Sequence, residues 1–542
     1  MISSLRATAI SVRRLRDPSI ALVVALVVAL SLLYEVVGRK AAHLAEQPGY
    51  LGLLTAGWFA AVLVAIWQWR FTYTDIWKPL RILARGAMIV LFVQILFDAL
   101  YPSSFVSNIF IGVYNDARLL IGLALISGVA AMFRPSFIPA TLLAYAWFRH
   151  RAPLAFDLTV TQLDFTTLAD VGLFSISALL ALRIFTNSPL ATKHKGIGEI
   201  LTHTAFPLRF QKAIWGLCVG IHLGNYFHSG IAKLRLGEGN LGFWVLENPT
   251  GQAVAIGLHR LNSPIGGWPW LTDLYYNFLT TFSIPMNLAV LALQLAAPLS
   301  VMNRRAMIAF TIAFDLMHLG IYASLGAFFF LWIALNVTIL LSLEAMRDSE
   351  LTIPVKLTAM IAALFGFMSF ATAELGWLDG KKVVRELFVA HRADGSSVVL
   401  PPAMFHLFAY QIGHGDLYVP PGHFKVRFGG NVNKLSEWQD AITCGPAVVG
   451  EQPYVASPES IGDMVRSMDG FYRRHEWIKD WNLPYFYAQH EPSNPAFFPK
   501  LSSIAMEDVI SYSYVVESAC VGVEDGRLKD HVRVRSVFPV AL

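Results

Sequence analysis

The stretch GLCVGIHLGNYFHSGIAKLR, residues 216–235, has the length and apolar character of a membrane helix but carries an unusual set of polar side chains. At helical spacing these polar residues share one face: His222, Asn225, Tyr226, Ser229 and Lys233. Ionisable groups are costly in hydrocarbon, so this face is expected to line a bundle interior or a wet cavity. The stretch is therefore predicted to carry a functional site.

The other side of the same helix is predicted to pack against lipid or neighbouring helices. It presents apolar side chains and one thiol: Cys218, Ile221, Phe227 and Ile231. Gly220 and Gly224 form a G-x-x-x-G pattern, which lets a second helix approach closely.

The composition is typical of a polytopic α-helical membrane protein. Of 542 residues, 55% are hydrophobic and only 15% are charged, and the mean hydropathy is +0.52. Such values exclude an ordinary soluble globule. The net charge of +5 comes from basic residues in loops, where they would meet lipid headgroups. Because no basic, aromatic-interleaved soluble domain occurs, no nucleic-acid partner is expected.

About 9–11 transmembrane helices are expected within a membrane domain at residues 19–378, after a basic cytoplasmic segment at residues 1–18. The apolar runs lie at 20–37, 51–69, 87–100, 119–133, 137–148, 163–185, 213–233, 278–301, 307–323, 327–343 and 357–377. A cleavable signal peptide is the alternative for the first run, but its length favours an uncleaved helix.

The positive-inside rule places the amino end in the cytoplasm and the carboxyl end outside the plasma (inner) membrane. The basic residues that then fall inside are Arg70, Lys78, Arg81, Arg85, Lys193, Lys195, Arg209, Lys212, Arg304, Arg305 and Arg347. This arrangement requires the short run 137–148 to cross, and it leaves Arg149 and Arg151 outside, against the rule.

Residues 379–542 are predicted to form an extracytoplasmic mixed α+β domain. Alternating strands flank the turns at Asp394-Gly395 and at 524–526: 382–390 with 397–400, and 511–523 with 531–538. A further strand is expected at 424–428 and a helix at 460–481. Cys444 and Cys520 could form a disulfide if this domain is in an oxidising compartment. The loop 237–276 is rich in Gly, Pro and aromatic residues, and is either an interfacial aromatic belt or a lid over a site.

A second helix, 307–323, places Asp315, His318 and Tyr322 on one face. A desolvated Lys233 amine could act as a base, with His318 nearby. The structural alternatives are that Lys233 extends to the headgroups and that Asp315 and His318 form a helix-locking pair. No metal is expected, because no H-x-x-x-H or C-x-x-C pattern occurs.

The segment NYFHSGIAKL, residues 225–234, resembles the HTTM family, whose membrane domain is shared with vitamin K-dependent gamma-carboxylase. Tyr226, Ser229-Gly230 and Lys233-Leu234 occupy the places of the family's tyrosine, small residue with glycine, and lysine-leucine. His318-Leu319, followed by the aromatic run 328–332, is similar to the family's later histidine-bearing helix. The resemblance covers roughly residues 10–380.

The resemblance implies a carboxylase-like lyase that uses a reduced vitamin K-type quinone, such as a menaquinol. In the carboxylase a lysine deprotonates the quinol, oxygen converts it to a strong base, and carbon dioxide adds to a glutamate carbanion. By resemblance, Lys233 would be the base and His318 would assist it. The pocket for substrate or quinol would include His222, Asn225, Tyr226, Ser229, Asp315 and Tyr322. The chain has Ala232 where the carboxylase has a second lysine, and its tryptophan comes late, at Trp244. The group that is modified on a peptide or protein substrate is therefore left open.

Two other functions remain open at this stage. The 164-residue tail from 379 to 542 suits a non-catalytic membrane factor that assists maturation or export of a partner. A transporter is the third possibility, in which Asp315 and His318 would relay protons.

Overall fold

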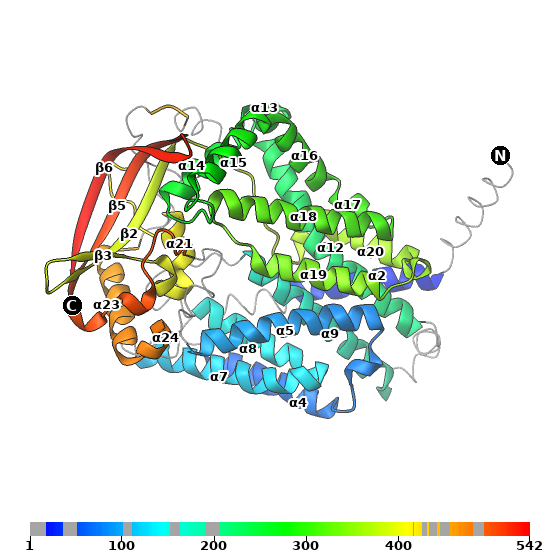
Figure 1. Ribbon diagram of the computed structural model, residues 1–542. Coiled ribbons are helices and arrows are strands. Elements are labelled where there is room, and N and C mark those ends of the chain that lie inside the picture. The colour runs from blue at the N-terminus through cyan, green and yellow to red at the C-terminus, as the bar shows by residue number, and fades with distance from the viewer. Residues whose placement is uncertain are drawn as a thin grey trace.

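The computed structural model describes residues 18–35, 51–100, 111–151, 163–189, 206–415, 417–424, 431–432, 442–444, 456–480 and 493–542. This part of the chain is mostly helical, with a small antiparallel sheet built mainly from its carboxyl-terminal residues. The sheet stands at one end of the helical bundle (Figure 1).

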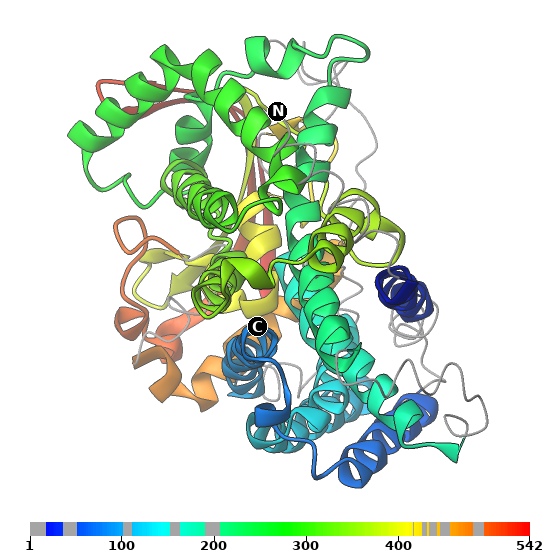
Figure 2. The same cartoon turned by 90° about the vertical axis from the view of Figure 1, so that its right-hand side faces the viewer.

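The amino-terminal half contributes helices that lie side by side, several of which are seen end-on in Figure 2. They are α2 (Pro18–Tyr34), α4 (Leu51–Trp67), α5 (Lys78–Leu100), α7 (Ile111–Phe133), α8 (Ile138–Arg151) and α9 (Leu163–Thr186). A single apolar core joins them to the later helices. The break between α7 and α8 falls at Pro135, which cannot donate the backbone hydrogen bond that a continuous helix needs.

Three helices of the described chain are long and apolar enough to cross a membrane. They are Lys78–Ala99, Phe165–Thr186 and Arg304–Leu325. A bent helix pair would add a fourth span, and several shorter apolar helices of 10–17 residues accompany them. The chain therefore has the composition and helix lengths of a membrane protein.

The predicted run 137–148 forms α8, whose end is held by buried charges. Arg149 is 1% exposed, and its Nη1 lies 3.3 Å from Asp98 Oδ2 on α5. The Tyr145 hydroxyl donates to the same carboxylate oxygen at 2.5 Å. The sequence placed Arg149 in an outer loop, against the positive-inside rule. In the structure it instead belongs to a buried group that joins α5 to α8. The side chain of Arg151 lies outside the described part.

The central helix α12 (Phe206–Arg235) packs closely against α20 (Ile353–Phe365) through its glycines. A Cβ atom built on Gly220 would lie 2.3 Å from the carbonyl oxygen of Ala359. At Gly224 the nearest atom, the carbonyl oxygen of Ala363, would be 3.3 Å away. The predicted close approach of a second helix is confirmed, and it is tightest at Gly220.

Two of the expected spans are wrong in their limits. Residues 278–301 do not form one helix, because α15 (Pro269–Thr281) and α16 (Ser283–Leu295) meet at a bend of 75°, before α17 (Ala297–Ser300). Pro285 lacks the N–H that would continue α15 into α16. The expected helix 357–377 ends early: α20 stops at Phe365, and after the short turn Gly366–Met368 the chain is extended.

The remaining helices of the bundle are α18 (Arg304–Leu325) and α19 (Phe330–Glu344), which lie at the positions predicted for 307–323 and 327–343. The segment 237–276 is not an irregular loop. It folds into α13 (Phe243–Glu247), α14 (Gln252–His259) and the start of α15. Its burial is uneven: Trp244, Val254 and Ile256 are each less than a tenth exposed, whereas Trp268 and Trp270 are 56% and 70% exposed.

The main sheet has the strand order β3-β2-β5-β6, and every pair is antiparallel. Its strands are β2 (Lys382–Arg392), β3 (Ser397–Leu400), β5 (Val509–Glu524) and β6 (Arg527–Ala541). Both predicted hairpins are confirmed, and the glycines at their turns, Gly395 and Gly526, have positive φ angles of 81° and 68°. A separate pair joins β1 (Leu378–Asp379) to β4 (Asn431–Val432).

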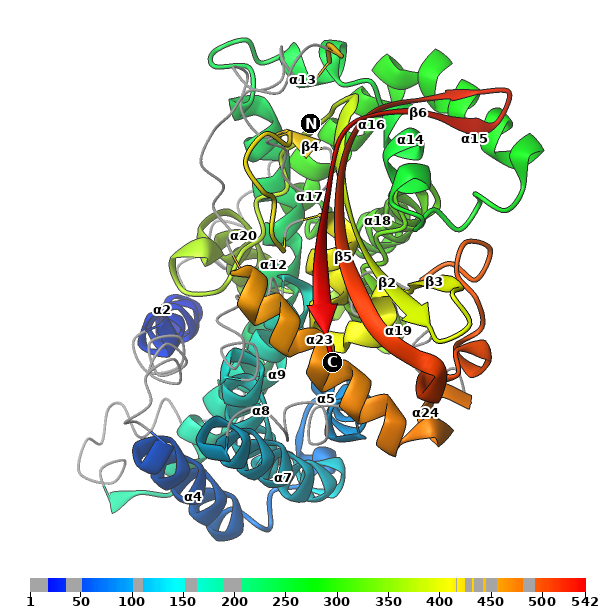
Figure 3. The ribbon, with the colours of Figure 1, turned by 90° about the vertical axis from the view of Figure 1, so that its left-hand side faces the viewer.

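One face of this sheet carries α23 (Pro458–Arg474), and Figure 3 shows β2, β5 and β6 side by side with α23 beside them. The predicted helix 460–481 is interrupted at His475, after which α24 (Glu476–Asp480) begins. Residue 481 and most of the strand expected at 424–428 lie outside the described residues. A short helix, α21 (Ala409–His414), packs near β2.

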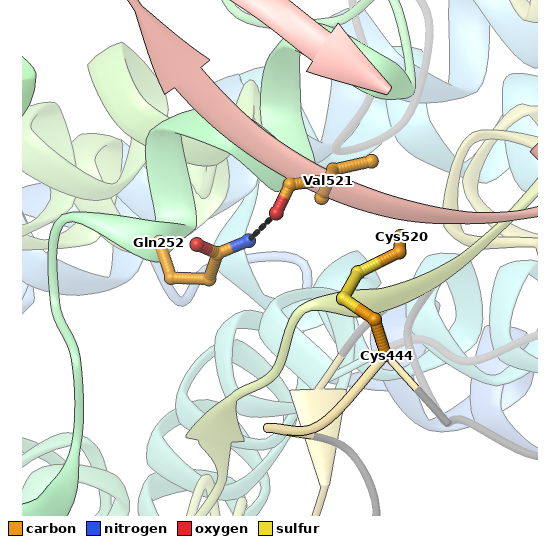
Figure 4. Close-up of a disulfide and its surroundings, with 4 residues drawn as sticks. All are labelled: Gln252, Cys444, Cys520 and Val521. Atoms are coloured by element: carbon orange, nitrogen blue, oxygen red, sulfur yellow. Dashed lines mark hydrogen bonds between the residues drawn. A yellow bond between two sulfur atoms is a disulfide. The ribbon is translucent and has the colours of Figure 1, made fainter. Parts of the chain in front are cut away.

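The sheet is tied to its surroundings at one position on β5. Cys444 and Cys520 are joined by a disulfide (Figure 4). At the next residue along β5, the Val521 carbonyl accepts a hydrogen bond of 3.0 Å from Gln252 Nε2 on α14. An apolar cluster that includes Ile256, Trp332 and Val521 continues from the helices into the sheet. The sheet and the helical bundle therefore share a packed interface.

Candidate functional site

The polar face of α12 holds an extended segment that leaves the bundle. Asn225 Oδ1 accepts a hydrogen bond of 2.7 Å from the Ala373 amide, and Ser229 Oγ accepts one of 3.0 Å from the Leu375 amide. One turn further, Lys233 Nζ donates to the Leu375 carbonyl at 2.5 Å. The spacing of four residues places these side chains in a line, so the segment that follows Met368 runs along the end of α12.

A cavity opens beside this contact, with about 800 Å³ of space free of atoms including its mouth. Its walls come from α12, α13, α14, α16, α18, α19 and the extended segment. Four of the residues predicted from sequence line it: Tyr226, Ser229, Lys233 and His318. The two helices singled out by their ionisable residues therefore meet at one cavity.

The Lys233 side chain is enclosed rather than extended to the surface. The residue is 5% exposed. Its Nζ lies 5.2 Å from the ring centroid of Trp244 and 5.5 Å from that of Trp377. Both distances fall within the range of a cation–π contact. The alternative in which Lys233 reaches toward headgroups is wrong, because aromatic rings and a carbonyl surround the amine.

Asp379 is a cavity residue that the sequence reasoning missed. It is 4% exposed, and Asn248 holds it twice: the Asp379 amide donates to Asn248 Oδ1 at 2.9 Å, and Asn248 Nδ2 lies 3.4 Å from Asp379 Oδ2. Burial raises the pKa of Asp379 to about 7, although the hydrogen bond from Asn248 and the Lys233 ammonium both act to lower it. In sequence the residue belongs to Leu378-Asp379-Gly380, which reads as an ordinary turn after a span.

His318 is enclosed by aromatic rings. It is 1% exposed, and its ring centroid lies 5.6 Å from that of Tyr226, 5.4 Å from Phe329 and 5.6 Å from Trp332. The carboxylate expected beside it, Asp315, instead accepts a hydrogen bond of 2.7 Å from Asn336 Nδ2. The proposed Asp315–His318 pair is therefore replaced by a pair between α18 and α19.

Asn336 connects three of the predicted residues behind the cavity wall. In addition to its bond with Asp315, Asn336 contacts two residues of α12. Its Oδ1 lies 2.7 Å from His222 Nε2, and its Nδ2 lies 3.1 Å from the Tyr226 hydroxyl. None of His222, Asn225 and Asp315 lines the cavity. His222 and Asp315 contact Asn336 behind the wall, and Asn225 holds the extended segment. Tyr322 does not line the cavity either, and its ring lies 4.8 Å from that of Phe328. An asparagine in an apolar helix was the available signal for Asn336.

Several buried polar atoms on the cavity wall have no hydrogen-bond partner among the described residues. They are Gln294 Oε1, His318 Nδ1, Trp332 Nε1 and Asp379 Oδ1. A buried polar atom without a partner is costly, so each such group in a native protein needs a reason. The set offers both donors and acceptors around aromatic walls, and it fits a flat aromatic ligand that carries hydroxyl or carbonyl groups. The residues present therefore fit a quinol.

No group of three or more His, Cys, Asp or Glu side chains that could hold a metal ion occurs in the part of the chain described here. Models of known protein families, curated proteins and solved structures were compared with the chain, and none of them matches it. The candidate function consequently rests on the chemistry of the cavity and on the residues quoted from the sequence.

Proposed function

We propose that the chain is a multi-pass membrane enzyme of the HTTM type, in which Lys233 takes a proton from a reduced quinone during a carboxylase-like modification of a peptide or protein. The observation that carries the proposal is the placement of the Lys233 amine: nearly buried, and on the wall of an aromatic cavity. The helices would cross the plasma membrane about 9–11 times, with the amino end in the cytoplasm and the sheet outside.

The surroundings of Lys233 favour a base. Burial of the Lys233 amine removes water from it and so disfavours its charged form. The cation–π contacts with Trp244 and Trp377 offset part of that cost. The Leu375 carbonyl fixes the direction of one N–H bond, which leaves the rest of the amine for the cavity. A reduced quinone would supply an acidic hydroxyl and reducing electrons. His318 Nδ1 and Gln294 Oε1 are the wall atoms that would bind its oxygens.

The charges at the other end of the bundle support the proposed orientation. Lys212 Nζ lies 3.4 Å from Glu350 Oε1, and Arg304 Nη1 lies 3.7 Å from Asp348 Oδ1. These residues lie where α12 and α18 begin and where α19 has ended, at the end of the bundle away from the sheet (Figure 1). The positive-inside rule counts Lys and Arg and gives Asp and Glu little weight, so Lys212 and Arg304 at the end opposite the sheet are consistent with an extracytoplasmic sheet.

The test is the consumption of reduced menaquinone and the fixation of labelled carbon dioxide by membranes that contain the chain, with glutamate-containing peptides added. Lys233→Met should lower quinol consumption about 100-fold or more, the range typical of a lost general base. Lys212→Met, at the opposite end of the bundle, is the matched control and should retain wild-type turnover. Quinol consumption by Lys233→Met within about twofold of wild type would refute the proposal.

The structure also contains a feature that favours the non-catalytic alternative, a factor assisting a partner's maturation or export. Strand β6 is 15 residues long and forms an edge of the main sheet, and its side chains at Val532 and Val537 are 47% and 53% exposed. An exposed edge of this length can pair with an extended segment of another protein. If this is the function, Lys233→Met is silent and Val537→Lys impairs partner binding.

A further inference from the structure

We propose that Asp379 acts through Lys233 rather than on the substrate: it receives the proton that the amine acquires and so returns the amine to its basic form inside the cavity. The inference rests on the proposed role of Lys233 as a base. It assigns a function to the first strand that follows the membrane domain, which neither the sequence pattern nor the quinol scheme includes.

The geometry isolates one carboxylate oxygen for this exchange. Asn248 holds the backbone amide of Asp379 and lies near Oδ2, and this contact fixes the orientation of the carboxyl group. Oδ1 is buried without a partner among the described residues, although Asp379 lines the same cavity as Lys233. A purely structural carboxylate would be expected to have both oxygens satisfied.

The exchange is balanced in atoms and charge. One N–H bond of the Lys233 ammonium breaks and one O–H bond forms on Asp379, so an ion pair becomes a neutral pair, with no change in oxidation state. Separated charges are expensive in a low-dielectric cavity, so the ionic and neutral pairs can be close in free energy. The other titratable side chains on the cavity wall are those of Tyr226 and His318.

The ionisation of the carboxyl group agrees with this role. Burial, the largest effect, raises the pKa of Asp379 to about 7. The Lys233 ammonium lowers this pKa, so the pKa of the carboxyl group depends on whether the lysine is charged. A carboxyl group that titrates near neutral pH can both accept and release a proton under ordinary conditions.

Difference infrared spectroscopy of the full chain in detergent micelles, without quinone, tests the coupling directly. The C=O stretch of a protonated carboxylic acid should contain a component that disappears with a midpoint near pH 7 in the wild type, and this component should be absent from Asp379→Asn. Asp525→Asn, at the exposed turn between β5 and β6, should retain it. In Lys233→Met the midpoint should rise by about one unit or more, because the ammonium that lowers it is gone.

Lys233→Arg keeps the charge and should leave the midpoint near that of the wild type, and Lys233→Gln replaces the Met variant if the latter does not fold. A wild-type spectrum without a neutral-range carboxyl band, or a midpoint that is the same with and without the charge at 233, overturns the inference.

A second arm separates the inference from the function on which it rests. Reduced menadione, added without oxygen, should shift the Asp379 midpoint and should be deprotonated by the wild type but not by Lys233→Met. Coupling between Asp379 and Lys233 without any response to reduced menadione would contradict the quinol function and leave the proton exchange standing. Where turnover is measured, the kcat of the wild type should rise between about pH 6 and 8. This rise should be missing in Asp379→Asn and should be restored in Asp379→Glu.

Discussion

Asp379 makes the stability of the protein depend on pH in the opposite sense from most carboxylates. Its pKa is raised from 3.8 to about 7 by burial. The folded state therefore binds the proton more tightly than the unfolded state does. Stability from this group is fully present below about pH 4 and is lost as the pH rises through 7. Asp379→Asn removes the titration and keeps the shape of the side chain.

The size of the effect follows from the shift. A rise of about three pKa units, at 1.36 kcal/mol each, corresponds to about 4 kcal/mol of stability lost between pH 4 and pH 7.5. For a chain of this length one kcal/mol changes the melting temperature by roughly 1 °C. The melting temperature of Asp379→Asn, measured relative to wild type, should therefore rise by up to about 4 °C between the two pH values.

The assay is thermal unfolding in micelles at a series of pH values, with Asp525→Asn as the exposed control. The control should follow the wild-type curve throughout. If the Asp379→Asn and wild-type curves are parallel from pH 4 to 7.5, the carboxyl group does not titrate in this range, and both the burial argument and the proton-acceptor role are wrong.

Three further predictions concern buried contacts elsewhere in the molecule. Gly220→Ala should destabilise the protein by about 1–3 kcal/mol, since its Cβ would lie 2.3 Å from the Ala359 carbonyl oxygen. Gly224→Ala, whose Cβ would lie 3.3 Å from the nearest atom, should destabilise it less. Equal melting temperatures of the two variants would refute the close contact at Gly220. Asp98→Ala should lower the free energy of unfolding by about 3–5 kcal/mol, because it leaves buried Arg149 without its carboxylate. In the double variant, Arg149→Met should recover part of that loss. Strictly additive effects would show that the two charges do not interact. Burial lowers the pKa of His259 from 6.5 to about 4, so stability present above pH 6.5 should be lost as the pH falls toward 4; His259→Gln should flatten this dependence, and an unchanged profile would contradict it.

Local chemistry made much of the fold predictable. The turns at Gly395 and Gly526 require positive φ, and the Asp-Gly pairs at these turns predict both hairpins. The glycine pattern of α12 predicted a close helix partner without naming it. The limits of the segment 357–377 could not be read in the same way. Residues 369–377 continue the run that was expected to be a helix, but side chains of α12 accept hydrogen bonds from the amides of Ala373 and Leu375. That contact is a tertiary arrangement, which the local sequence does not show.

The candidate site was predictable only in part, for a similar reason. Lys233 and His318 are conspicuous because each is an ionisable group in an apolar helix, and both line the cavity. Asn225 and Ser229 share the face of Lys233, yet they bind the backbone of the extended segment. Asp379 and Asn336 come from distant parts of the chain, and nothing local shows that they converge on α12. Periodicity identifies which residues share a face but not what lies opposite.

The backbone between the last helix of the bundle and the sheet is also the hydrogen-bond partner of the Lys233 amine. A truncation that removes the sheet together with this segment would take away Leu375, Trp377 and Asp379, which are three sides of the amine's enclosure. The helical part and the sheet are therefore not exchangeable modules. A fragment containing the helices alone would expose the lysine to water, and any force that a bound partner exerts on the sheet would reach the amine through fewer than ten residues of chain.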